Sequence, residues 1–238
     1  MRKDHRPPYL KRLYVGYERF YVNHFLRPQF EHLGRDFNFM QPWNVEVFGP
    51  LVHIGDHVSI MAASDEKVRF TVWSDREDLR GIHIGDACLI NPGVRISAAR
   101  EIVIGNSAML ASGVYITDTD WHGLYDRVGP GPVSPVRLGD NVWVGDGVMV
   151  GKGVTIGDNS IIGARSIVLH DIPANVVAAG NPARVIRELD PDTPMRTRAD
   201  WFAQSDLNSD LQAIDKALLK HNTLRHWLRT RLFPRRGD

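Results

Sequence analysis

Residues 138–168 read LGDNVWVGDGVMVGKGVTIGDNSIIGARSIV, and an aliphatic residue recurs at every sixth position: Leu138, Val144, Val150, Ile156, Ile162 and Val168. Glycine directly follows the first five of these aliphatic residues. A period of six matches neither the 3.6-residue repeat of a helix nor the two-residue repeat of one long strand. It is typical of short strands that are joined by tight corners and stacked as a solenoid.

In such a solenoid, the aliphatic residues point inward and stack on their equivalents in the coils above and below. We expect each adjacent glycine at a corner, where a side chain would clash or where φ is positive. Three hexads make one triangular coil, and neighbouring coils stand about 4.8 Å apart. An antiparallel β domain with turn glycines would instead show alternation between turns of variable spacing.

Similar hexads extend the pattern towards the N-terminus. They begin at Ile54, stop over a polar insertion at 61–81, and resume from Ile84 to Ile116 with one two-residue slip after Ile102. Prolines and glycines break the register again at 117–135. We therefore predict a solenoid domain over 50–187 with an insertion at 61–81 and a protruding loop at 117–135. The loop also carries histidine, aromatic and charged residues, and such loops on rigid scaffolds are common functional sites.

The bulk composition excludes several classes of protein. The formal net charge of +1 over 238 residues is too balanced for the whole chain to bind nucleic acid. Cys88 is the only cysteine, so no intrachain disulfide forms and a reducing compartment is favoured. The first residues lack the apolar core of a signal peptide, and no window holds about 18 uninterrupted apolar residues. The sequence predicts a cytoplasmic protein.

Both ends of the chain are predicted to be helical. In the segment 1–49, residues 9–26 carry aromatic residues at helical spacing after a Pro7-Pro8 start, which favours a helix that caps the exposed end of the solenoid. The alternative is a helix lying in a membrane interface. In the segment 188–238, residues 199–220 have helical spacing, and 223–236 form a basic amphipathic tail. This tail is predicted to dock on a neighbouring subunit or on an anionic membrane, as a peripheral contact.

Residues 156–187, IGDNSIIGARSIVLHDIPANVVAAGNPARVIR, resemble the terminal coils of hexapeptide-repeat acyltransferases. The resemblance covers about 84–187 and is closest to the maltose, galactoside and O-antigen O-acetyltransferases. It implies a mainly β fold, a left-handed parallel β-helix, with an N-terminal helix and a C-terminal α-helical extension. It also implies a homotrimer that binds acetyl-CoA between neighbouring helices, with no metal.

The resemblance further implies a catalytic histidine on the loop that leaves the solenoid, and this loop offers only His122. The O-antigen group has Asp-His-x-His-Gly after Ile-Thr or Ile-Ser; this chain is one residue longer, with Thr119 at the position of the first histidine. An imidazole that titrates near neutral pH can remove the proton of an attacking sugar hydroxyl. Asp118 and Asp120 are both candidates to orient it.

Three further residues are candidate contacts of a saccharide acceptor. Trp121 and Tyr125 flank the histidine, and their rings either stack on a pyranose or anchor the loop by burial. By resemblance, Asn91 occupies the position of an acceptor-contacting asparagine; the alternative is an asparagine that only shapes a corner.

Coenzyme A is an extended polyanion, and the late coils are rich in side chains that can carry positive charge: Lys152, Arg165, His170, Arg184 and Arg187. We expect them to form a basic strip along the solenoid axis. By resemblance, Asp146 and Ala164 line the pantetheine arm through their backbone. The resemblance also places the adenine and phosphates among Leu169, His170, Arg184 and Arg187, although the family often has Thr-Lys at 169–170.

The leading hypothesis from the sequence is an acetyl-CoA-dependent O-acetyltransferase that acts on a saccharide hydroxyl, such as a cell-surface polysaccharide or a lipid-linked sugar. An N-acyltransferase acting on an amino sugar is the nearest alternative. A γ-type carbonic anhydrase shares the scaffold but needs two histidines about one hexad apart and a third from the neighbouring subunit, and the coils show no such pair. A non-catalytic β-helix is the remaining alternative.

Overall fold

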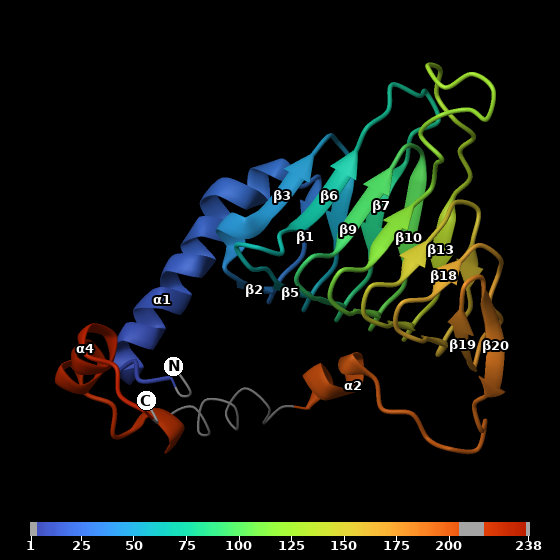
Figure 1. Ribbon diagram of the computed structural model, residues 1–238. Coiled ribbons are helices and arrows are strands. Elements are labelled where there is room, and N and C mark those ends of the chain that lie inside the picture. Colours follow the sequence, from blue (N-terminus) through green and yellow to red (C-terminus); the bar gives the residue numbers. More distant parts are fainter. Residues whose placement is uncertain (1–3, 205–216, 237–238) are drawn as a thin grey trace.

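The computed structural model describes residues 4–204 and 217–236, and its centre is a triangular parallel β-helix (Figure 1). Sheet A contains β1 (His32–Leu33), β4 (Val52–Ile54), β7 (Gly81–Ile84), β10 (Glu101–Ile104), β13 (Val136–Leu138) and β16 (Thr155–Ile156). Sheet B contains β2 (Asn38–Met40), β5 (Ser59–Met61), β8 (Leu89–Ile90), β11 (Met109–Leu110), β14 (Trp143–Val144), β17 (Ile161–Ile162), β19 (Val176–Gly180) and β20 (Ala183–Glu188). Sheet C contains β3 (Val45–Phe48), β6 (Val68–Val72), β9 (Arg95–Ala98), β12 (Tyr115–Thr117), β15 (Met149–Val150) and β18 (Ile167–Val168).

Each sheet takes one strand from each successive coil, and every strand pair is parallel except β19 with β20. The inward residues stack in register, because the hexad aliphatics are exact structural equivalents from coil to coil. On sheet A, Ile84 pairs with Ile104, Ile104 with Leu138, and Leu138 with Ile156, and none of these side chains is more than 4% exposed. The predicted mainly β solenoid is therefore confirmed.

We name the three edges of the prism by the sheets that meet there: A–B, B–C and C–A. At the A–B edge, the glycine after the inward aliphatic is needed for close approach. A Cβ on Gly105 would lie 2.6 Å from the carbonyl carbon of Gly139 in the next coil. Positive φ falls instead two residues later, as at Ser107 and Asn141. At the B–C edge, Gly113 and Gly147 do have positive φ.

The β-helix begins earlier than predicted, and the segment 61–81 is not simply an insertion. The first coil starts at His32, inside the segment predicted as a helical cap. β6 lies in the middle of 61–81, and its fully buried Phe70 pairs with Val47 below and Ile96 above. The flanking corners, 62–67 and 73–80, are longer than a hexad corner such as 145–148. The six-residue phase is therefore lost, while the inward alternation of the strand is kept.

The N-terminal helical segment covers the first coil. It consists of α1 (Pro8–Tyr21), the π-helical turn η1 (Val22–Leu26) and the 3-10 turn η2 (Arg27–Gln29); a further turn, η3 (Pro42–Asn44), lies within the first coil. Val22 and Leu26 are buried in the core, and the Glu18 carboxylate accepts the backbone N–H of Gln41 at 2.7 Å. The opposite face of α1 leaves Leu13 and Phe20 exposed. Contact of 9–26 or 223–236 with a membrane stays a prediction, which co-sedimentation with anionic vesicles can test.

The C-terminal segment returns along the A–B edge as a strap of residues 189–203, which ends in α2 (Arg198–Ala203) (Figure 1). The Arg198 guanidinium donates to the carbonyl of Ala87 and the hydroxyl of Ser59, and Phe202 stacks on His57. The rest of the helix expected at 199–220 falls largely on 205–216, outside the described residues. α4 (Leu224–Leu232) lies beside the start of α1, where Asn222 donates to the Asp4 carbonyl.

Within 4–204 and 217–236, no helix has the length and apolar character needed to cross a bilayer.

Candidate active site

The loop that leaves the β-helix between β12 and β13 projects from the C–A edge (Figure 1). Its two arms are joined at the base, because Thr119 forms an antiparallel bridge with Val133 and Ser134 N–H donates to the Asp118 carbonyl at 2.8 Å. The backbone N–H of His122 then donates to the Asp120 carbonyl at 2.8 Å. His122 is exposed and stands three residues beyond the bridge. The sequence therefore presents this imidazole on a braced hairpin.

Asp118 does not contact His122. Its fully buried carboxylate accepts the backbone N–H groups of Ala99, Arg100 and Glu101, each at 2.7 Å. Burial raises the pKa of Asp118, and the three N–H donors oppose that rise. Asp118 therefore joins the loop to the corner of the preceding coil, and its expected role in orienting the histidine is not supported by this geometry.

Asp120, the other candidate, forms an ion pair with Lys152 at 2.6 Å. Lys152 lies at the C–A edge one coil further on, so this pair ties the loop to the corner above it. Across the described parts of the chain, the His122 imidazole has no hydrogen bond or ion pair. Its ring is thus held by the backbone of the loop and is free to meet a substrate.

The two aromatic neighbours of His122 behave differently. Trp121 adopts a positive φ of 63°, and its indole N–H donates to the Tyr115 hydroxyl at 3.4 Å, on the outer side of β12. The Arg95 guanidinium lies over the ring of Tyr115 at 4.4 Å. Trp121 therefore has an anchoring contact on sheet C, whereas Tyr125 is fully exposed at the outer part of the loop.

The remaining candidates divide between two edges of the prism. Asn91 lies at the B–C edge, where its amide donates to the Leu110 carbonyl at 3.0 Å. Asp146, Ala164 and Arg165 lie at the same edge, and Arg165 pairs with Asp146 at 3.1 Å. Lys152, Leu169 and His170 follow the strands of sheet C and lie at the C–A edge. One chain thus has two candidate rows on either side of sheet C, and the single basic strip expected from the sequence is wrong.

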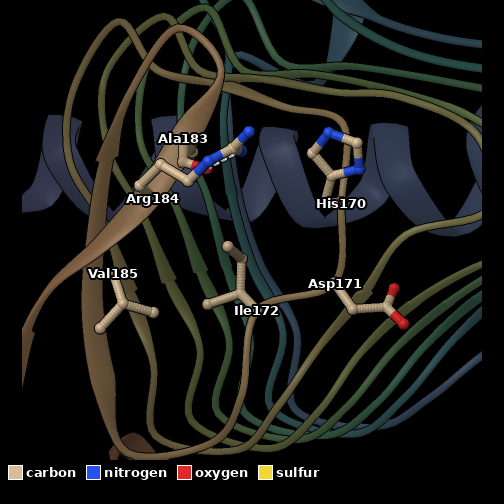
Figure 2. Close-up of a pocket in the computed structure, with 6 residues that line it drawn as sticks. All are labelled: His170, Asp171, Ile172, Ala183, Arg184 and Val185. Carbon is tan, nitrogen blue, oxygen red and sulfur yellow. Dashed lines mark hydrogen bonds between the residues drawn. The ribbon is translucent and has the colours of Figure 1, made fainter.

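His170 and Arg184 line one pocket of about 400 Å³ at the C-terminal end of the C–A edge. Figure 2 shows both side chains at the same end of the pocket, with the Arg184 guanidinium turned back to donate to the Ala183 carbonyl at 2.9 Å. Arg184 is permanently charged, and a guanidinium suits a phosphate or carboxylate. Asp171 also lines the pocket, and its carboxylate points away from His170 (Figure 2). Arg187 lies further along β20, opposite Val177.

A larger pocket of about 760 Å³ lies further towards the N-terminal end, between the loop and the ends of β3 and β6. Phe48 and Trp73 line it, and neither was among the site residues predicted from the sequence. The alternation of Val68, Phe70 and Val72 is the signal that could have identified β6, and with it Trp73 as the residue that leaves the strand at the edge.

The structure also shows a pair of histidines one coil apart that the sequence did not predict. His53 and His83 occupy paired positions on β4 and β7, and their rings stack at 4.4 Å. The pair was missed because 61–81 was counted as an insertion rather than as part of a coil. Within residues 4–204 and 217–236, no three histidine, cysteine or acidic residues are grouped so that they could hold a metal ion.

Comparison with known proteins identifies the repeats. Residues 135–170 match the family model of the bacterial transferase hexapeptide, six repeats. The galactoside O-acetyltransferase of Escherichia coli K12 is 44% identical over 110 residues, which cover 45% of this chain and 54% of that protein. The Saccharomyces cerevisiae protein YJL218W is 42% identical over 118 residues, which cover 45% of this chain and 56% of that protein. The chain thus spans about half the length of these curated relatives.

Among solved structures, the N-acyltransferase AntD of Bacillus cereus has the same fold, with a TM-score of 0.57 and 17% identity over 81% of this chain and 96% of that chain. The fold is a parallel β-helix, which agrees with the left-handed β-helix expected from the sequence, and residues 135–170 match hexapeptide repeats. The resemblance of the sequence to hexapeptide-repeat acyltransferases is confirmed, and segment 135–170 carries the hexapeptide repeats of bacterial transferases.

Proposed function

We propose that this protein is an acetyl-CoA-dependent O-acetyltransferase that acts on a saccharide hydroxyl, with His122 as the general base. One observation carries the proposal: an exposed imidazole, with no side-chain partner among residues 4–204 and 217–236, stands on a braced loop at the edge that also holds the candidate coenzyme residues Leu169 and His170. The similarity to a galactoside O-acetyltransferase over the repeat region supports the same activity.

In this mechanism, the His122 imidazole removes the proton from the acceptor hydroxyl while its oxygen attacks the thioester carbonyl carbon. The carbon–sulfur bond then breaks, and the proton passes from the imidazolium to the coenzyme thiolate. A backbone N–H from a facing coil is the simplest donor to the transient oxyanion. The Asp120–Lys152 ion pair and the Asp118 contacts keep the loop in place. The loop backbone, rather than a carboxylate bound to the imidazole, therefore positions His122 for the hydroxyl.

The coenzyme is proposed to lie along sheet C between two copies of the chain. Asp146, Ala164 and Arg165 lie on one side of this sheet, and Leu169 and His170 lie on the other, so one copy cannot wrap them around a single ligand. The strap covers the A–B edge, which leaves the B–C and C–A edges available to neighbouring copies. A homotrimer of cyclic symmetry would bring the B–C edge of one copy, with its Asn91, to the C–A edge of the next.

The coenzyme phosphates are proposed to bind at the pocket between His170 and Arg184, with Arg187 and Lys152 adding positive charge nearby. The planar guanidinium of Arg184 can donate to two oxygens of one phosphate. The loop and this pocket occupy the same C–A edge, which allows an extended thioester ligand to reach from one to the other.

The test is replacement of His122 by alanine. We expect kcat to fall by about 10²–10⁴-fold, because proton removal is lost, while acetyl-CoA binding and assembly stay unchanged. Burial raises the pKa of the Cys88 thiol to about 12, so a thiol reagent added to native protein reports released coenzyme rather than this cysteine.

The matched control is His32→Ala, since His32 is exposed on the first coil, far from the loop in the coil order. Acceptors with a hydroxyl and with an amine are assayed in parallel, which separates O-transfer from N-transfer. Turnover by His122→Ala at the level of the control would refute the assignment of the base.

A further inference from the structure

The pocket beside the loop is an aromatic groove at the C–A edge. We define this groove by Phe48, Val72, Trp73, Trp121, Val128 and Val133, which line it together with shorter residues. Its floor comes from the ends of β3 and β6, and its wall comes from the loop. Its volume of about 760 Å³ falls in the range of about 300–1,000 Å³ that ligand pockets have.

Two aromatic rings form an open platform in the groove. Phe48 and Trp73 are 56% and 68% exposed, and their ring centroids are 5.4 Å apart with a tilt of 38°. Phe48 is the last residue of β3 and Trp73 directly follows β6, so the backbone hydrogen bonds of the β-helix fix where the rings start. Large aromatic rings exposed side by side on a rigid edge are typical of a binding surface.

Polar side chains adjoin the platform. Ser74, Asp75 and Arg76 line the groove directly after Trp73. Arg76 is held by Asp78 at 2.8 Å, and Asp78 also pairs with Arg100 at 3.1 Å, so this stretch is tied to the corner of the next coil. The groove therefore combines apolar ring faces with fixed donors and acceptors.

The wall of the groove is connected to His122. Gly131 lines the groove, and a Cβ on this residue would lie 2.5 Å from the carbonyl oxygen of His122. Both arms of the braced hairpin thus line the groove, since Trp121 directly precedes His122 and Gly131 packs on the His122 backbone from the other arm. A ligand in the groove lies against the arm that packs on the backbone of His122.

We propose that this groove binds the non-reacting sugar rings of the acceptor, and that Trp73 and Phe48 are the residues that select a saccharide. This inference rests on the proposed function and names a subsite for its acceptor. A pyranose has an apolar face of C–H groups and a rim of hydroxyls, which matches the ring platform and its neighbours Ser74, Asp75 and Arg76. A lipid chain would leave these polar groups without partners in an occupied groove.

The experiment measures saccharide binding without turnover, using full-length protein that carries His122→Ala on an array of immobilised oligosaccharides. We expect binding to a subset of the array. Adding Trp73→Ala should weaken it by about tenfold or more, while Trp73→Phe retains most of it because a ring face remains. The control is Trp143→Ala, which removes a 47% exposed tryptophan from the outer face of sheet B.

Acetyl-CoA binding is measured by calorimetry on the same proteins and separates the two proposals. Two results with retained coenzyme binding would overturn the groove proposal alone. The first is that the His122→Ala protein binds no saccharide. The second is that the Trp73→Ala and Trp143→Ala proteins bind saccharide equally well. Loss of coenzyme binding in Trp73→Ala also overturns it, because the groove would then belong to the donor. Wild-type protein that binds no acetyl-CoA overturns the proposed function, whatever the array shows.

Discussion

The carboxylate of Asp118 accepts three backbone N–H groups from residues 99–101 in a fully buried position. A neighbouring residue, His122, keeps its ring exposed, although both belong to the same short stretch. The difference arises because Asp118 still occupies a corner of the coil, where its oxygens accept backbone N–H groups that no neighbouring strand pairs with. His122, in contrast, stands beyond the bridge at Thr119. One residue supports the loop and the other is available for chemistry.

Replacing Asp118 by asparagine should destabilise the protein by about 2–4 kcal/mol, because an amide NH₂ then faces buried N–H donors that have lost their acceptor. The measurement is urea unfolding, with the exposed Asp65→Asn as control. Lost activity at unchanged stability would contradict this prediction and would return Asp118 to a role in orienting the histidine.

The corners of the coils are stabilised by side-chain ladders that run along the A–B edge. The backbone N–H of Asp56 donates to Asp86, that of Asp86 to Asn106, and the series continues through Asp140 to Asp158 at 2.6–2.8 Å. Amides of Asn141, Asn159 and Asn175 form a second ladder beside it. The Gly-Asp-Asn triplets of the hexads thus satisfy backbone groups that a tight corner would otherwise leave unpaired.

Gly105→Ala should destabilise the protein by about 1–3 kcal/mol, because the added methyl meets the backbone of Gly139 as well as the side chain of Asp140. The matched control is Gly16→Ala in α1, where a Cβ meets nothing within 4 Å and where alanine favours the helix by about 1 kcal/mol. Thermal unfolding of both variants should therefore shift in opposite directions. A melting temperature of Gly105→Ala at or above that of wild type would show that the corners are less tightly packed.

The two rows of candidate residues on either side of sheet C can form one site only if neighbouring copies of the chain share it. If neighbouring copies share each site, then His122 comes from one copy and Ala164 from the next. Ala164 is exposed at the B–C edge, so a tryptophan there would obstruct the coenzyme without entering the core.

Co-expression of His122→Ala with Ala164→Trp should restore about a quarter of wild-type activity, because random mixing in a cyclic assembly pairs intact edges at that frequency. Each variant alone should be inactive, and a mixture of two differently tagged His122→Ala chains serves as the control. Mixed assemblies that stay inactive, or a monomer in light scattering, would argue against a shared site.

The repeat itself could be predicted from the sequence, because a strict six-residue period fixes which side chains face inward. The pairing of Leu138 with Ile156, three hexads further along, follows from that count alone. The count failed where the corners lengthen: β6 was hidden in 61–81, and the first coil was assigned to the cap. Local pattern cannot detect a strand whose partners lie about 20 or more residues away in irregular steps.

The sequence by itself determined the hexads, the solenoid and the loop with its single histidine, because each depends on residue type at short spacing. Only the tertiary structure decided that Asp118 binds a corner, that the cationic residues separate onto two edges, and that Phe48 and Trp73 meet beside the loop. These outcomes depend on which edge of the prism a residue reaches. That is set by the summed lengths of all preceding corners, a property that no short stretch of the chain contains.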